Sequence, residues 1–235
     1  MRLFCSIFLT IAALAGCAKK NAETVPMTPK DTIKTYLALG DSYTIGEAVP
    51  HAESFPYTVV QRVNQQGGLN FTYPPKIVAT TGWTTDNLIN AIAQSGLEGK
   101  TYDMVTLLIG VNDQYQNLSQ DNYRIKFQQV LETAIAFAGG NKSRVFVLSI
   151  PDWGVTPFAQ GKAAVVGPLI DQFNAVNRSI SEVEGVNYLD ITPISRRAAA
   201  EPDLVAADGL HPSGTMYGLW VEELAPLVVS KLSKL

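Results

Sequence analysis

A short polar turn near the start of the chain carries the residue best suited to act as a nucleophile. Gly40-Asp41-Ser42 follows the apolar run Tyr36–Leu39, which is typical of a buried strand. A serine on a tight turn just after a strand presents its hydroxyl group to solvent. Asp and Ser are also common in ordinary turns, where their side chains bond nearby backbone groups. The turn alone therefore indicates a candidate nucleophile and leaves a purely structural turn open.

The far end of the chain supplies a candidate base for that serine. Asp208 lies three residues before His211, and the only other histidine is His51, which we expect in an exposed loop. A serine hydroxyl becomes a strong nucleophile when an adjacent base takes its proton and an acceptor orients that base. Asp208 and His211 can form this pair if the fold brings them to Ser42. The alternative is a C-terminal turn in which Asp208 caps the following helix.

Two further polar turns each follow an apolar run. Gly82 comes after Ile77–Ala79, and Gly110-Val111-Asn112-Asp113 comes after Met104–Ile109. Glycine lets a backbone N–H approach a substrate closely, and an asparagine amide is a neutral donor suited to a developing oxyanion. Each turn by itself favours a plain loop. The four turns together, in this order and each beside an expected strand, indicate a hydrolytic site.

These four blocks resemble those of the GDSL-type, or SGNH, serine hydrolase superfamily, over about residues 35–212 and in the family's order. The resemblance implies that Ser42 is the nucleophile of an esterase that works through an acyl-enzyme intermediate. It implies that His211 is the general base and that Asp208 orients its imidazole. Neither a metal nor an organic cofactor is implied. The substrate is expected to be a small-molecule or glycan ester, and lipases, arylesterases, thioesterases and O-acetylesterases stay equally open.

The same resemblance implies an oxyanion hole. Its donors would be the backbone N–H of Ser42, the backbone N–H of Gly82 and the side-chain amide of Asn112. The first block departs from the family pattern because Tyr43 follows the serine where the family has leucine. That residue carries no chemistry, so the departure affects only the local shape of the pocket.

Other classes of protein are weighed against this hypothesis. The chain has no Gly-x-Ser-x-Gly elbow and no His-Glu-x-x-His motif, which disfavours an ordinary α/β-hydrolase and a zinc protease. A metal site built from Asp41, Asp113, Asp208 and His211 is an alternative, but it leaves Ser42 without a role. A non-catalytic surface binding lipoprotein with the same fold is a second alternative. An envelope structural protein is a third, although the sequence has no repeat or coiled-coil pattern.

The N-terminal residues predict export and lipid attachment. Arg2 precedes an apolar run over residues 3–14, which has the length of a signal-peptide core and is too short to span a membrane. Leu14-Ala15-Gly16-Cys17 resembles the bacterial lipobox, which implies cleavage before Cys17 and acylation of its thiol. We therefore expect a signal peptide at 1–16, a flexible tether at 17–34 and a hydrolase domain at 35–235. The alternative is a buried N-terminal helix with an incidental cysteine.

This arrangement places the protein in the bacterial cell envelope. We expect a lipid-anchored, extracytoplasmic protein of the periplasm or outer membrane, because two or more acyl chains anchor a protein stably. The net charge is −3 and the sequence contains no basic run, so nucleic acid is not an expected partner. About 200 residues suit one well-buried core and a single domain. We also expect a monomer.

Apolar strands and amphipathic helices alternate along this domain, and the pattern predicts the fold class. The expected strands are Tyr36–Leu39, Ile77–Ala79, Met104–Ile109, Val145–Ile150 and Val186–Leu189. The expected helices are Phe55–Gln66, Thr85–Ser95, Ser119–Ala138, Pro168–Val183 and Ser213–Lys231. Such alternation implies a parallel sheet covered on both faces, an α/β/α sandwich of three layers. The family resemblance makes this sheet five-stranded and flavodoxin-like, and parallel sheets bind ligands at the carboxyl ends of their strands.

Residues 153–167 form the segment that the pattern leaves unassigned. A loop of this length in a compact domain is usually functional or mobile. It follows an expected strand at the same rim as the four turns. Together with Tyr43, Trp83 and Tyr115 it could wall an aromatic pocket for an acyl or alcohol group. The alternative is that these aromatic side chains pack beneath their own loops.

Overall fold

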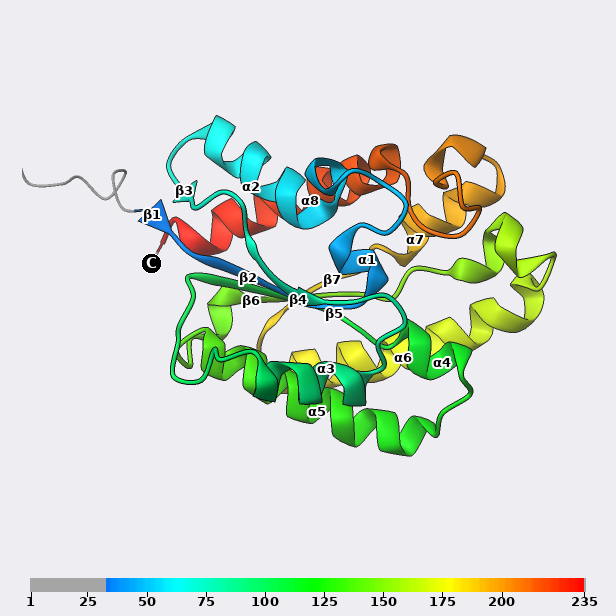
Figure 1. The fold of residues 1–235 in the computed structure, drawn as a ribbon, viewed down its shortest axis with the longest axis horizontal. Helices are drawn as coiled ribbons and strands as arrows, with labels where there is room; N and C mark the ends of the chain where they lie inside the picture. Colours follow the sequence, from blue (N-terminus) through cyan, green and yellow to red (C-terminus); the bar gives the residue numbers. More distant parts are fainter. Residues whose placement is uncertain (1–32, 235) are drawn as a thin grey trace, which may run out of the picture.

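Five parallel strands form the central sheet of this protein, whose computed structural model describes residues 33–234 (Figure 1). Their bounds are β2 (Tyr36–Gly40), β4 (Lys76–Ala79), β5 (Met104–Leu108), β6 (Val145–Leu148) and β7 (Asn187–Leu189). Their order across the sheet is β4-β2-β5-β6-β7, and every neighbouring pair is parallel. Numbered along the chain, this is the flavodoxin-like order 2-1-3-4-5. The predicted fold class is confirmed.

The strand order creates a switch point between β2 and β5. After β2 the chain moves outward to β4, and it then crosses back to place β5 on the other side of β2. The connections that leave β2 and β5 therefore diverge, which opens a crevice at the carboxyl ends of these two strands. The turns carrying Ser42 and Asn112 follow these two strands directly.

Helices cover both faces of the sheet (Figure 1). The helices α2 (Phe55–Gln66) and α8 (Gly214–Leu232) pack side by side over one face. The other face is covered by α3 (Thr85–Gln94), α5 (Gln120–Phe137) and α6 (Ala163–Glu184). Local signals start several of them, since the hydroxyl groups of Thr84, Ser119 and Ser213 each accept a bond from a backbone N–H in the first turn.

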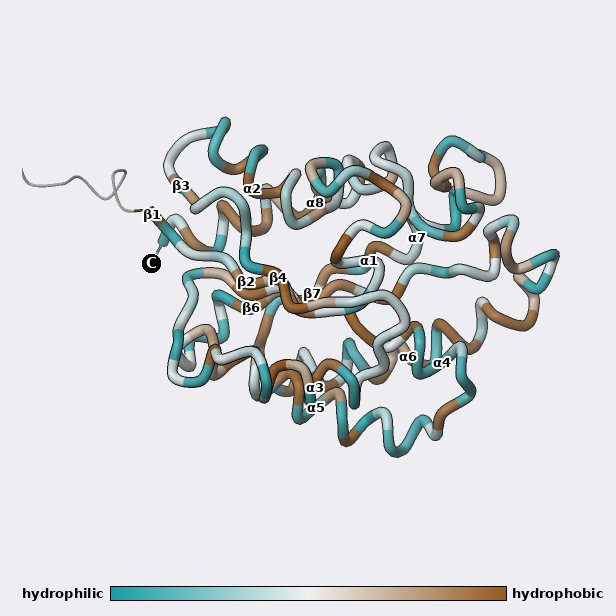
Figure 2. Tube along the Cα trace, viewed as in Figure 1, coloured by the Kyte–Doolittle hydropathy of each residue, from teal (hydrophilic) through white to brown (hydrophobic). Residues whose placement is uncertain are grey.

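The strands are apolar without alternation because both faces of the sheet are covered. Every residue of β2, β5 and β6 is buried, as expected for a parallel sheet between two helical layers. Figure 2 shows this as hydrophobic strands at the centre, with hydrophilic residues recurring along the outer helices. In α8 the side chains of Met216, Trp220 and Leu224 are buried, and Trp220 packs against Phe55 of α2.

Two of the differences between the structure and the sequence-based expectation concern the start of α6 and the end of the tether. The helix expected from Pro168 begins at Ala163, and two short 3-10 turns, η4 (Trp153–Val155) and η5 (Pro157–Ala159), precede it. Proline favours the first helical turn, but here Pro168 lies in the second turn, where it removes a single backbone hydrogen bond. The last residues of the expected tether also form a strand, because β1 (Ile33–Lys34) pairs with β3 (Asn70–Phe71) in a second small sheet.

The predictions for the N-terminus lie outside the described residues. The expected signal peptide, the lipobox and most of the expected tether fall within residues 1–32. Within residues 33–234, no helix combines the length and the apolar character needed to cross a membrane.

Candidate active site

The Ser42 turn is built by its neighbours. Ser42 is the first residue of the short helix α1 (Ser42–Ile45), and the Asp41 side chain caps this helix by accepting the Tyr43 N–H at 3.0 Å. Only glycine fits at position 40, because a Cβ there would lie 2.1 Å from the Thr44 hydroxyl oxygen. This close packing places Ser42 at the carboxyl end of β2, with its backbone N–H at a helix start.

Asp208 holds His211 in a defined orientation. The ring Nδ1–H of His211 donates to Oδ2 of Asp208 at 2.5 Å, and the N–H groups of Leu210 and His211 donate to Oδ1 at 3.0 Å each. Because the carboxylate accepts a hydrogen bond from Nδ1–H, the proton of the neutral ring lies on Nδ1. The other nitrogen, Nε2, is free to accept a proton. Burial opposes ionisation of Asp208, but the hydrogen bonds from the His211 ring and the two backbone groups outweigh it and lower its pKa.

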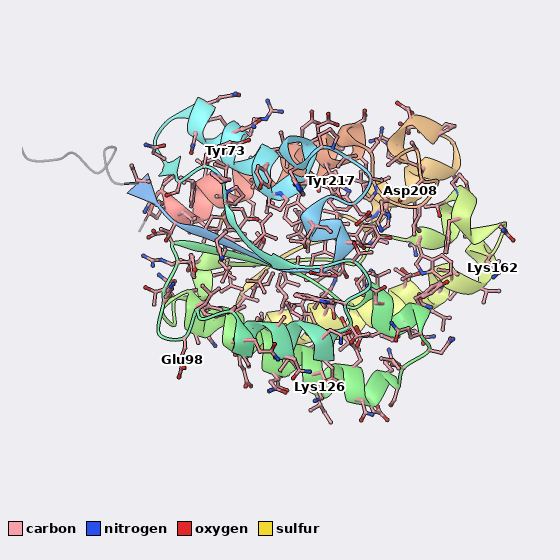
Figure 3. All side chains as sticks on the ribbon, in the orientation of Figure 1. Tyr73, Glu98, Lys126, Lys162, Asp208 and Tyr217 are labelled. Carbon is pink, nitrogen blue, oxygen red and sulfur yellow. The ribbon has the colours of Figure 1, made fainter. Side chains whose placement is uncertain are left out.

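Residues from four separate loops meet in one cavity of about 120 Å³. Ser42, Asn112 and His211 all line it, so three of the predicted site residues are brought together. The remaining lining residues are Tyr43, Val111, Tyr115, Trp153, Phe158 and Leu210. The ring of Tyr43 lies 5.5 Å from that of His211, centroid to centroid. In Figure 3, Asp208 lies in the right-hand half of the view, on the same side as Lys162.

Asn112 connects this cavity to the turn that contains Gly82. It lies on the short helix α4 (Val111–Tyr115), and its side-chain Nδ2 donates to the Trp83 carbonyl at 3.0 Å. Gly82 is exposed, with a positive φ of 79°, and it is not among the residues that line the cavity. Trp83, expected as a possible pocket wall, does not line the cavity either, because its side chain packs partly buried against the core.

A pair of buried carboxyl groups lies beneath the nucleophile turn. Asp113 accepts the N–H and the hydroxyl of Thr85 at 2.9 and 3.0 Å, which ties the start of α3 to α4. Burial raises the pKa of Asp113 to about 6 against the effect of these bonds. Burial also raises the pKa of Asp41 to about 8, with Asp113 adding to the effect and the Tyr43 N–H opposing it. Asp41 is therefore protonated in the folded protein at neutral pH.

The cavity has an aromatic side, as expected for residues 153–167 together with Tyr43 and Tyr115. Trp153 and Phe158 come from η4 and η5, and the ring of Trp153 lies 5.3 Å from that of Tyr115. The indole N–H of Trp153 donates to Oε1 of Gln114 at 2.8 Å, and both residues are buried. Trp153 and Phe158 both belong to residues 153–167, the segment to which the sequence pattern assigned no helix or strand.

The structure does not gather the four residues of the alternative metal site. Within residues 33–234, no group of three or more His, Cys, Asp or Glu side chains is close enough to hold a metal ion. Asp208 is paired with His211, while Asp113 is bonded to Thr85. His51 lies on the exposed turn η2 (His51–Glu53), as expected.

Several solved structures share the fold of this chain. No curated protein matches this chain. The crystal structure of TesA matches with 17% identity and a TM-score of 0.65, over 85% of this chain and 99% of that one. The esterase EstA from Pseudoalteromonas sp. matches with 16% identity and a TM-score of 0.63, over 84% and 97%. The acetylxylan esterase Axe2 from Geobacillus stearothermophilus matches with 16% identity and a TM-score of 0.60, over 87% and 96%.

These structures share the fold with this chain, and the sequence itself carries the family assignment. Residues 38–219 match the model of the GDSL-like Lipase/Acylhydrolase family, which covers well over half of the chain. The matched range contains all four of the polar turns from which the site is built. The chain is therefore a member of the GDSL-like lipase/acylhydrolase family of ester hydrolases.

Proposed function

We propose that this protein is a serine ester hydrolase in which Ser42, His211 and Asp208 form the catalytic triad. The observation that carries the proposal is the cavity in which Ser42, Asn112 and His211 meet, with Asp208 bonded to the far side of the imidazole. A serine, a base and an orienting carboxylate in this relation are what nucleophilic ester hydrolysis requires. Family membership supports ester hydrolysis in general.

In the proposed mechanism His211 acts first as a base and then as an acid. Its Nε2 takes the proton of the Ser42 hydroxyl while Oγ attacks the ester carbonyl carbon. The tetrahedral intermediate collapses, the alcohol leaves with the proton held by His211, and Ser42 stays acylated. A water molecule then gives a proton to His211 and attacks the acyl carbon. This second tetrahedral intermediate collapses, Ser42 Oγ takes the proton back from His211, and the acid is released. Asp208 stays ionised throughout and stabilises the imidazolium that forms at each step.

Three donors are proposed to stabilise the oxyanion: the N–H of Ser42, the N–H of Gly82 and the amide of Asn112. The Ser42 N–H lies at the start of α1, where backbone N–H groups have no partner within the helix. An asparagine amide carries two N–H donors, and the Trp83 carbonyl takes one of them. The second can serve the oxyanion, while the bond to Trp83 fixes its direction. The same bond holds the Gly82 turn next to Asn112.

The experiment that tests the triad is covalent labelling with a fluorophosphonate probe. We expect the wild-type protein to be labelled on Ser42 and to hydrolyse 4-nitrophenyl acetate. Ser42→Ala should lose both signals and keep its circular dichroism spectrum. The matched control is Ser179→Ala, which removes an exposed hydroxyl on α6 and should change neither. Turnover that survives in Ser42→Ala would rule out Ser42 as the nucleophile.

We also propose that Cys17 is lipidated and anchors the enzyme outside the cytoplasm. The support is the sequence alone: an apolar run over residues 3–14 that ends in Leu14-Ala15-Gly16-Cys17. Metabolic labelling with palmitate tests it, with Cys17→Ser as the variant. We expect label on the wild-type protein and none on Cys17→Ser. Label that persists in the variant would contradict the proposal.

A further inference from the structure

We propose that Tyr217 is a positioning residue for the nucleophile and acts on Ser42 through the backbone of Tyr43. The inference rests on the proposed ester hydrolysis and adds a residue to that same site. The Tyr217 hydroxyl donates to the Tyr43 carbonyl at 2.9 Å, a bond between residues 174 positions apart in the sequence. Tyr217 does not line the catalytic cavity, so its effect on catalysis must pass through the turn that carries Ser42.

The Tyr43 carbonyl depends on this one donor. Helix α1 is a single turn, and the N–H groups of Gly46 and Glu47 beyond it both bond to the Ser42 carbonyl at 3.1 Å. Within residues 33–234, only the Tyr217 hydroxyl reaches the carbonyl of Tyr43. Both tyrosines are buried, so water has no ready access to replace the donor. Burial also raises the pKa of Tyr217 well above its ordinary value, so the hydroxyl keeps its proton and stays a donor.

Tyr217 belongs to the helix that directly follows the His211 loop (Figure 3). The Ser213 side chain caps this helix, α8, only two residues after His211. The ring of Tyr217 packs against those of Trp220 and Phe55, with centroid separations of 5.0 and 6.4 Å. The hydroxyl is therefore held on a well-packed helix. Its bond connects the segment that carries the base to the segment that carries the nucleophile.

Tyr43, the residue after the nucleophile, is restrained at three points. Its N–H donates to Asp41 at 3.0 Å, its carbonyl accepts from Tyr217, and its ring lies 5.5 Å from that of His211. The Asp41 bond comes from the same turn, whereas the Tyr217 bond ties the turn to another part of the fold. Loss of the second bond frees the turn to shift relative to His211. A misplacement of about 1 Å in a catalytic constellation can lower the rate by about 10².

The test is Tyr217→Phe, which removes the hydroxyl and keeps the ring. We expect kcat for 4-nitrophenyl acetate to fall at least about tenfold with KM within about twofold of wild type, because positioning acts on the transition state. The rate of fluorophosphonate labelling of Ser42 should fall by a similar factor. Both rates are measured at a temperature at which circular dichroism shows the variant fully folded, so that lost stability by itself lowers neither.

The matched control is Tyr36→Phe. The Tyr36 hydroxyl shares a hydrogen bond of 2.7 Å with the Thr106 hydroxyl, is also buried, and lies at the other end of β2 from Ser42. This variant loses a buried hydrogen bond of the same kind, so its Tm should fall while kcat and the labelling rate stay at the wild-type values. A second variant places 4-aminophenylalanine at position 217. It restores a donor on the same ring, so it should recover most of kcat, and it tests the proposal independently of whether Tyr217→Phe folds.

Three results would overturn the inference. They are a kcat loss below about threefold in folded Tyr217→Phe, an equal loss in Tyr36→Phe, and a low kcat in the folded 4-aminophenylalanine variant. In each case, labelling of the wild type on Ser42 would show that the proposed function still holds. A wild type with neither labelling nor turnover would overturn both.

Discussion

Replacement of Asp41 by asparagine should stabilise the folded protein at neutral and alkaline pH. The Asp41 carboxyl is fully buried in the nucleophile turn, and its Oδ2 has no hydrogen-bond partner among the described residues. Burial raises its pKa from 3.8 to about 8. Asparagine has the same shape and does not ionise. Its Oδ1 can accept the Tyr43 N–H as Asp41 does, so the cap of α1 is kept.

The magnitude follows from linkage between protonation and folding. Below pH 3.8 both the folded and the unfolded protein hold the Asp41 proton, so the group contributes no pH dependence. Between pH 3.8 and about 8 only the folded protein holds it, and the free energy of unfolding falls as pH rises. At ~1.4 kcal/mol per pH unit, the free energy of unfolding falls by roughly 6 kcal/mol across this pH range. Asp41→Asn avoids this cost, so its advantage over the wild type should grow with pH and level off above about pH 8.

Urea denaturation at several pH values between 5 and 8 measures this difference. Comparison of variant with wild type at each pH cancels the titration of groups common to both. Asp113, whose pKa is also raised, is common to both proteins. Asp121→Asn is the control, because this carboxylate is exposed at the start of α5. A difference between Asp41→Asn and wild type that stays constant from pH 5 to 8 would show that Asp41 is ionised when folded and refute the reasoning.

Three further predictions concern the site. Asp208→Asn should lower kcat by about 10⁴ with the fold intact, because the imidazole loses the acceptor that selects its tautomer; a kcat within tenfold of wild type would exclude the triad. Asn112→Ala should lower kcat by about 10²–10³ with a smaller change in KM, as steady-state kinetics would measure, whereas a pure KM effect would assign it to ground-state binding. Gly40→Ala should prevent folding or lower Tm sharply, since the new Cβ would meet the Thr44 hydroxyl at 2.1 Å and the Leu108 carbonyl at 2.4 Å; an unchanged melting curve would show that this packing is looser.

The sequence by itself determined the framework of the domain. Strands buried between two helical layers are continuous apolar runs, so β2, β5 and β6 are visible without tertiary information. Turns need particular residues for local reasons, which is why Gly40 and the Asp208–His211 segment could be located from their types and spacing. The Asp208–His211 hydrogen bond joins residues only three positions apart. A contact of that range depends little on the rest of the fold.

Tertiary structure decided what surrounds those residues. The aromatic side of the cavity depends on bonds between distant positions, such as Trp153 to Gln114 and Phe158 to Gly209. Trp83 turned toward the core and away from the cavity, and α6 began before Pro168. The raised pKa of Asp41 arises from burial by other segments. Side-chain environments of this kind are set by long-range packing, which local residue patterns do not encode.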